Sequence, residues 1–191
     1  MITSSNGGIL VKDGGSTLVL AGASTYSGGT QINAGTLNGT GSVGSVSVAS
    51  GGILAPGLSV GPLNVNGTVD LMAGSHLDYN LGGVSSLLNI SGALNYTGGG
   101  TAIFDIANTG SMTSGTDYTL INYASESGLS LANLALGNTP PIFTAHFVIG
   151  ANVLTLHVDT VPDPSRAVLG ILGLAFIALR RRRSVRKVVV A

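Results

Sequence analysis

The sequence predicts an all-β fold, either a coil of β-structure or a sandwich, followed by one short apolar helix near the C-terminal end. Three observations predict it: short segments that alternate apolar with polar residues, glycine pairs between them, and one uninterrupted apolar run. Thirty of the 191 residues are glycine and only 8% are charged. Because the mean hydropathy is nevertheless positive, charge-driven disorder is excluded.

The strands are predicted by apolar and polar residues in strict alternation, which is typical of half-buried strands. The segments are 45–48, 63–66, 77–81 and 153–158. Pairs such as Gly14-Gly15, Gly28-Gly29 and Asn66-Gly67 separate such segments and supply the positive φ values that tight turns require. No segment before residue 167 shows the apolar repeat of a helix, so short strands and glycine turns make up the body.

The apolar run covers residues 167–179 and contains no charged or polar side chain. As a helix it spans roughly 20 Å, whereas a bilayer core is about 30 Å thick. It is therefore short for a permanent anchor, and it can cross only if the bilayer thins and Arg166 and Arg180 snorkel to the interfaces. We expect a short transmembrane helix over 167–179.

Basic residues follow this run directly, as Arg180, Arg181, Arg182 and Arg183, then Arg186 and Lys187. Residues 1–160 carry one basic residue, Lys12, against seven acids. The positive-inside rule then places the tail 180–191 in the cytoplasm and the body outside. The alternative is a buried core helix with a solvated basic tail that touches nucleic acid. No aromatic residue lies near the arginines to stack on a base, so no nucleic-acid partner is expected.

The tail resembles a PEP-CTERM sorting signal, in which a Pro-Glu-Pro motif, a membrane stretch and an arginine-rich end follow one another. Here the motif is Pro162-Asp163-Pro164, with Asp in place of the usual Glu. The resemblance implies that an exosortase, a membrane-embedded processing enzyme, recognises the motif and cleaves nearby. It also implies a Gram-negative host that makes extracellular polysaccharide, which becomes a further expected partner. The two prolines keep the segment extended and out of the following helix.

The body resembles the autotransporter-associated β-strand repeat, nearly residue for residue over 16–37 and more loosely over 48–57 and 61–67. The specific likeness covers about residues 8–81, and a weaker one extends to about 158. Such passenger domains are right-handed parallel β-helices exported to the bacterial surface, so the resemblance implies that fold. No translocator barrel follows in this sequence, and the PEP-CTERM-like tail takes its place.

The expected dimensions follow from a coil of about twenty residues and a spacing of about 4.8 Å. Residues 1–158 then make roughly eight coils in a rod of about 38 Å. The open ends would expose strand edges, which suggests capping or joining to more sequence. Residues 1–6 lack the basic and apolar regions of a signal peptide, so we expect a fragment of a longer protein or a misassigned start.

Two catalytic motifs occur but lack the required context. The first, from Gly57 to Gly61 around Ser59, matches GxSxG, yet a nucleophile elbow needs a following helix and Pro62 opens an alternating segment instead. The second, 39–44, matches GxGxxG, whose phosphate-binding use also needs a following helix. Both are interpreted as turns.

One strand face carries His76, Asp78 and Asn80, which is a conceivable weak metal site but more simply a solvated face. His146 and His157 are interpreted as solvated or hydrogen-bonded surface residues. The acids of the body are spread thinly along the sequence. A β-helix enzyme acting on polysaccharide would need them grouped on adjacent coils, so convergence of Asp70, Asp78 and Asp105 in a groove would favour that alternative.

The expected domains are a β-helical module (1–158), a linker with the sorting motif (159–166), a transmembrane helix (167–179) and a basic cytoplasmic tail (180–191). We expect a noncatalytic, structural or adhesin-like surface protein, with no catalytic residue, no metal and no cofactor. Cysteine is absent, which leaves no thiolate nucleophile or zinc-type cluster. In transit the C-terminal helix sits in the inner membrane, and the body then reaches the outer surface or the extracellular space. The alternative is a carbohydrate-active lyase or hydrolase, and a third possibility is a stalk whose tail is never cut.

Overall fold

The computed structural model describes residues 7–24, 26, 28–57, 61–82, 85–108, 112–137 and 143–161. The chain divides into two units, 1–160 and 161–191, and of the second only Val161 is described. The predicted sorting motif, the apolar run 167–179 and the arginines 180–183 therefore lie outside the described residues. Within the described ranges no helix is long and apolar enough to cross a membrane.

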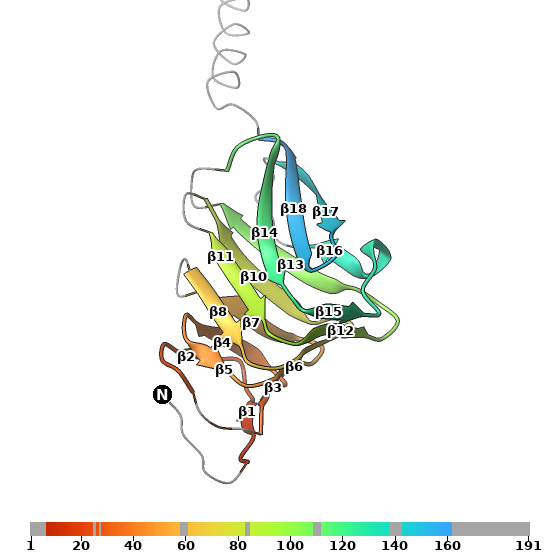
Figure 1. Ribbon diagram of the computed structural model, residues 1–191. Coiled ribbons are helices and arrows are strands. Elements are labelled where there is room, and N and C mark those ends of the chain that lie inside the picture. The colour runs from red at the N-terminus through yellow and green to blue at the C-terminus, as the bar shows by residue number, and fades with distance from the viewer. Residues whose placement is uncertain are drawn as a thin grey trace, which may run out of the picture. The chain divides into compact units, whose positions relative to one another are not determined.

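The described residues form three six-stranded sheets (Figure 1). The first sheet contains, in order, β1 (Leu10–Lys12), β3 (Thr30–Ile32), β6 (Val46–Val48), β9 (Val69–Met72), β12 (Ala93–Thr97) and β15 (Ser125–Ser127). The second contains β16 (Leu134–Leu136), β13 (Ala102–Asn108), β10 (His76–Leu81), β7 (Gly52–Pro56), β4 (Gly35–Gly39) and β2 (Thr17–Leu20). The third contains β17 (Thr144–Ile149), β18 (Val153–Thr160), β14 (Thr116–Asn122), β11 (Ser86–Ile90), β8 (Gly61–Val65) and β5 (Ser42–Val43).

The chain visits the three sheets in a fixed rotation, so each circuit forms one coil of a solenoid. Strands β3, β4 and β5 make one coil, and β6, β7 and β8 make the next. Neighbouring coils pair in parallel as far as β14, β15 and β16, as when β10 pairs with both β7 and β13. The only helix in the described ranges is a short 3-10 turn, Leu131–Asn133. The prediction of an all-β chain with the parallel sheets of a β-helix is confirmed.

The coils are not uniform in length. Thr30 pairs with Val46, sixteen residues further on, whereas Ala93 pairs with Ser125, thirty-two residues further on. The expectation of about eight coils of constant length is therefore wrong, because each sheet has six strands and the later coils are larger. Larger coils need longer strands, and β13 and β14 have seven residues each, against three in β3 and β6.

The core is a column of aliphatic and aromatic side chains that the alternation directs inward. In β10 the pattern alternates from half-buried to buried, with Leu77, Tyr79 and Leu81 at most 1% exposed. The same alternation buries Leu154, Leu156 and Val158 in β18. The four segments predicted from alternation therefore all lie within or along strands, with their apolar residues inside.

The end of the solenoid beyond β14 is closed by an antiparallel hairpin. Strand β18 pairs antiparallel with β14, and β17 pairs antiparallel with β18, which ends the parallel stacking (Figure 1). Strand β17 alternates exposed with half-buried residues, and its Phe147 packs on the buried Phe104 with ring centroids 4.9 Å apart. The hairpin thus covers the edge of β14 in the third sheet, whereas β15 and β16 are the terminal strands of the other two.

The first coil is held by the sole lysine of the described residues. Lys12 is 5% exposed, and its Nζ donates hydrogen bonds to the carbonyl oxygens of Asp13, Gly14 and Ala34 at 3.0, 2.6 and 3.0 Å. Gly35 has a φ of 70°, and a Cβ there would overlap the Gly14 carbonyl and approach the Lys12 ammonium. Glycine at 35 therefore permits this ammonium–carbonyl cluster.

Candidate functional site

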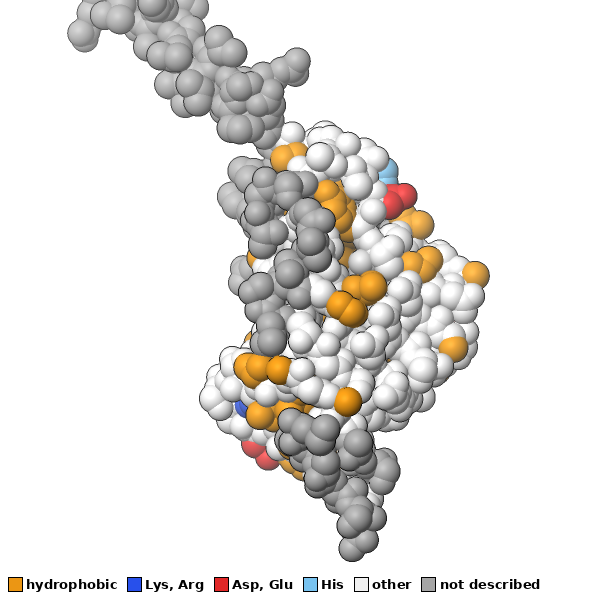
Figure 2. Space-filling model, turned by 60° about the vertical axis from the view of Figure 1, so that its left-hand side comes forward, with side chains coloured by type: hydrophobic (Ala, Val, Ile, Leu, Met, Phe, Trp, Pro, Cys, Tyr) orange, Lys and Arg blue, Asp and Glu red, His pale blue; other side chains and the backbone are white. Residues whose placement is uncertain are grey.

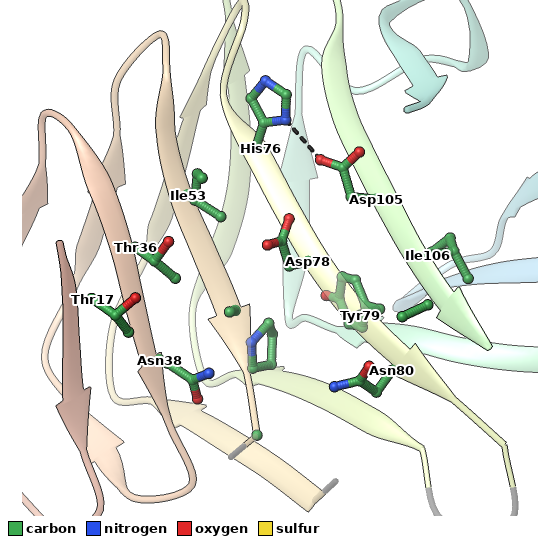
Figure 3. A pocket seen from close by; sticks show the side chains of 14 residues that line it. Thr17, Thr36, Asn38, Ile53, His76, Asp78, Tyr79, Asn80, Asp105 and Ile106 are labelled. Atoms are coloured by element: carbon green, nitrogen blue, oxygen red, sulfur yellow. Dashed lines mark hydrogen bonds and ion pairs between the residues drawn. The ribbon is translucent and has the colours of Figure 1, made fainter. Parts of the chain in front are cut away.

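The candidate site is a groove of about 650 Å³ on the outer face of the second sheet. It crosses β2, β4, β7, β10 and β13, so it runs along the stack of coils (Figure 3). The lining residues are Thr17, Thr36, Asn38, Ile53, Ala55, Pro56, Gly57, His76, Asp78, Tyr79, Asn80, Asp105, Ile106 and Ala107. We call it the sheet groove.

Strand alternation and parallel register bring the polar residues of the sheet groove together. Alternation in β10 turns His76, Asp78 and Asn80 away from the core. Register then places Asp78 directly beside Asp105 of β13. A residue 27 positions later thus becomes a lateral neighbour, because one coil separates the two strands.

His76, Asp105 and Asp78 form a connected group at one end of the sheet groove. His76 Nδ1 lies 2.7 Å from Asp105 Oδ2 (Figure 3). Asp78 is the lateral neighbour of Asp105, so the charge of Asp105 acts on the Asp78 carboxyl group. The His76 and Asp105 side chains are 32% and 20% exposed, so the group is accessible but poorly solvated.

The surroundings of Asp78 raise the pKa of its carboxyl group. Burial, and after it the neighbouring Asp105, raise the pKa of Asp78 to about 6 against the opposing effect of His76. Two carboxylates side by side disfavour double ionisation. Asp78 therefore keeps its proton into the weakly acidic range.

The sheet groove contains more hydrogen-bond acceptors than charged donors. Its lining has two carboxyl groups and no lysine or arginine. The buried Oδ1 of Asn38 has no hydrogen-bond partner in the described part of the chain. Ile53, Ala55 and Pro56 supply apolar surface between the polar groups. Such a surface favours a ligand with several donors and some apolar area.

Gly137 lies against Asp105 and was not singled out in the sequence. It follows β16, and its N–H donates to the Phe104 carbonyl at 2.9 Å. A Cβ at 137 would overlap Asp105 Oδ1. A side chain here would displace the carboxylate, so glycine positions Asp105 by leaving room for it.

The N-terminal coils of the solenoid match a known sequence repeat. Residues 10–38 match the model of the passenger-associated-transport-repeat. No curated protein matches the chain. The match lies within the region where the sequence resembles the autotransporter-associated repeat, so that part of the resemblance is confirmed.

The passenger-associated-transport-repeat covers β1 to β3 and most of β4, and with them the N-terminal part of the sheet groove. Thr17, Thr36 and Asn38 fall inside it, whereas the group at Asp78 falls outside. The repeat is associated with autotransporter passenger domains, which indicates export to the cell surface or the extracellular space. The PEP-CTERM resemblance concerns residues outside both the match and the described structure.

The acids named for the enzyme alternative converge only in part. Asp78 and Asp105 meet in the sheet groove, but Asp70 lies in β9 of the first sheet, where it accepts a 2.7 Å hydrogen bond from Asn95. Sequence distance hid the Asp78–Asp105 pair. No local signal identifies the pair, since Asp70 also lies in a strand between two apolar residues, in Val69-Asp70-Leu71.

The two remaining histidines lie on the third sheet and each has an aspartate partner. His157 Nδ1 lies 2.6 Å from Asp117 Oδ1, and His146 Nδ1 lies 3.0 Å from Asp159 Oδ1. They are hydrogen-bonded surface residues, as expected. In the described ranges no group of three or more His, Cys, Asp or Glu side chains could hold a metal ion.

The two catalytic-type motifs lie on strands and turns, as interpreted. The GxGxxG segment includes the end of β4 and all of β5, and β6 follows it. In the GxSxG segment Ser59 lies outside the described residues, and Gly61 opens β8. No helix follows either motif within the described ranges, so neither has the strand–helix context that its chemistry requires.

Proposed function

We propose that the protein is a noncatalytic, structural or adhesin-like module of the bacterial surface, built as a β-solenoid. The observation that carries this proposal is the parallel stack of coils whose first turns match the passenger-associated-transport-repeat. The outward side chains support it, because they are mostly uncharged. Figure 2 shows one face on which hydrophobic side chains are scattered and charged ones are few.

We further propose that a PEP-CTERM-like tail sorts the protein. In this scheme an exosortase recognises Pro162-Asp163-Pro164, while residues 167–179 hold the chain in the inner membrane and Arg180 to Arg183 stay in the cytoplasm. The support is the order of motif, apolar run and basic end in the sequence. Extracellular polysaccharide is the proposed surroundings of the released or transferred body.

The second candidate is a carbohydrate-active enzyme, favoured by the meeting of Asp78, Asp105 and His76 in one groove. A carboxyl group with a pKa near 6 is suited to act as a general acid. An enzyme of this class would release shortened sugars from bacterial polysaccharide, and Asp78→Asn would abolish that release. A noncatalytic module releases none, with or without the substitution.

The experiment that tests the sorting proposal is the intact mass of the mature protein recovered from cells, with its C-terminal peptide mapped. A terminus between Pro162 and Arg166 is expected. A terminus at Ala191 would identify a simple anchor and would end the exosortase proposal.

A further inference from the structure

The sheet groove is longer than a single ion or a small metabolite. Four steps of about 4.8 Å separate β2 from β13, so the sheet groove extends over about 19 Å. That length exceeds the reach of a single ion or a small metabolite. An oligomeric ligand that lies along the stack of coils fits it better.

The charge of the sheet groove is one-sided. Two carboxyl groups line it without a lysine or arginine, and Lys12, the sole such residue among those described, uses its ammonium on three carbonyl oxygens. An acidic polysaccharide would be repelled here. A cationic ligand would instead be attracted to the two carboxyl groups.

The hydrogen-bond acceptors of the sheet groove also favour a ligand that carries several donors. Asn38 Oδ1 is a buried acceptor without a partner among the described residues, which costs free energy until a donor reaches it. Hydroxyl and ammonium groups on one ligand would satisfy both Asn38 and the carboxyl pair. The apolar patch of Ile53, Ala55 and Pro56 lies between them and suits the C–H face of a sugar ring.

A glycan fits better than a peptide for a structural reason. Peptides commonly bind sheets by adding a strand to an open edge. The sheet groove lies on a sheet face, where β4, β7 and β10 are each already paired on both sides. Recognition here must use side chains, as it does for sugar hydroxyl and amino groups.

We propose that the sheet groove binds an oligosaccharide with free amino groups, placing an ammonium group between Asp78, Asp105 and His76. The inference rests on the proposed function in that it takes the surface module as a binding protein that does not cleave its ligand. Binding is noncovalent. As the ammonium group approaches, Asp78 gives up its proton to solvent, because a neighbouring cation favours the carboxylate.

The test is calorimetry of the complete chain with a glucosamine oligosaccharide near pH 6. We expect saturable binding, with a proton released in amounts that buffers of different ionisation enthalpy reveal. The fully N-acetylated oligosaccharide of the same length should bind at least tenfold more weakly, and a galacturonate oligosaccharide should not bind. Oligolysine of equal charge should bind at least tenfold more weakly than the amino sugar.

Variants locate the site. Asp105→Asn should weaken binding by tenfold or more, whereas the matched Asp70→Asn, which removes one charge on another sheet, should leave it unchanged. If Asp105→Asn does not fold, Thr36→Lys adds a cation to the sheet groove from β4 and should weaken binding without altering the pair. Equal binding of neutral and amino sugars, equal binding of oligolysine, or indifference to these variants each overturns the inference.

Chromatography of the ligand after incubation separates this inference from the proposed function. Bound and intact ligand supports both. Bound and shortened ligand supports the site but overturns the noncatalytic role. No binding, together with a C-terminus between Pro162 and Arg166, overturns the inference and leaves the sorting proposal standing.

Discussion

Phe147 lies on Phe104 with ring centroids 4.9 Å apart and ring planes inclined by 59°. Phe104 is fully buried in β13, and Phe147 belongs to β17, which is antiparallel to its neighbour. The contact joins the last parallel coils to the closing hairpin. It seals apolar surface that parallel stacking alone would leave open to water.

Phe147→Ala should therefore destabilise the closing hairpin. The loss is about 2 kcal/mol, less than for a fully buried phenylalanine because Phe147 is only half-buried. Urea unfolding measures it. Val148→Ala is the matched control, since Val148 is 43% exposed on the other face of the same strand and should change stability by at most about 0.5 kcal/mol. Equal losses would show that the aromatic contact does not hold the hairpin.

Asp78 should make stability fall as the pH rises. Its folded-state pKa of about 6 lies above the ordinary value of 3.8, so the folded protein binds more protons between these values. Stabilisation present below about pH 4 is lost by about pH 7. Asp78→Asn should remove this dependence. Relative to pH 4, the free energy of unfolding at neutral pH should then be about 1 kcal/mol higher in the variant than in the wild type, a figure reduced for the partial solvation of Asp78. Chemical unfolding across this range measures the gain.

Carboxyl NMR offers a direct measurement of the same group. The Asp78 resonance should titrate near pH 6 in the wild type. In Asp105→Asn the pKa of Asp78 should fall but stay above its ordinary value, because burial, the largest cause, remains. An unchanged midpoint would contradict the carboxyl pairing.

Gly137→Ala should disturb the carboxyl pair from outside the sheet groove's lining. The added methyl group overlaps Asp105 Oδ1, so the carboxylate must move. We expect a loss of about 1–2 kcal/mol and a displaced Asp78 titration midpoint. Gly99→Ala is the control, because a Cβ there meets no atom within 4 Å. If both variants leave the midpoint in place, Gly137 does not position Asp105.

Lys12→Met should loosen the first coil. It leaves three carbonyl acceptors without the ammonium group that serves them, at a cost of about 2 kcal/mol. Hydrogen exchange should show faster opening of the Lys12–Asn33 region, where the amide of Asn33 bonds to the Lys12 carbonyl. Val11→Met, on the exposed face of the same strand, should leave that exchange unchanged.

Local pattern predicted the strands well, because side-chain alternation and glycine turns act over a few residues. Leu63, Val65 and Leu77 are inside as expected. The size of the coils was not predictable in this way, since it depends on which distant strands pair. For the same reason the sequence could name Asp70, Asp78 and Asp105 as candidates for convergence but could not tell which two meet, although Asp78 was correctly placed on a polar face.

The antiparallel ending was equally hidden. The segment 153–158 alternates just as a parallel strand would, so nothing local distinguishes its direction. Direction is set by the short connection between β17 and β18, in which Gly150 N–H donates to the Val153 carbonyl at 2.8 Å. A connection this short forces neighbouring strands to run in opposite directions.

The change in coil length from sixteen to thirty-two residues has a mechanical consequence. Hydrogen bonds between coils lie along the axis, so tension along it would peel coils away one after another. Each released coil adds about 3.4 Å of chain per residue, which gives about 5 nm for the smallest and about 11 nm for the largest. A tether on the cell surface built this way would lengthen under load in unequal steps, and the size of each step would report which coil had opened.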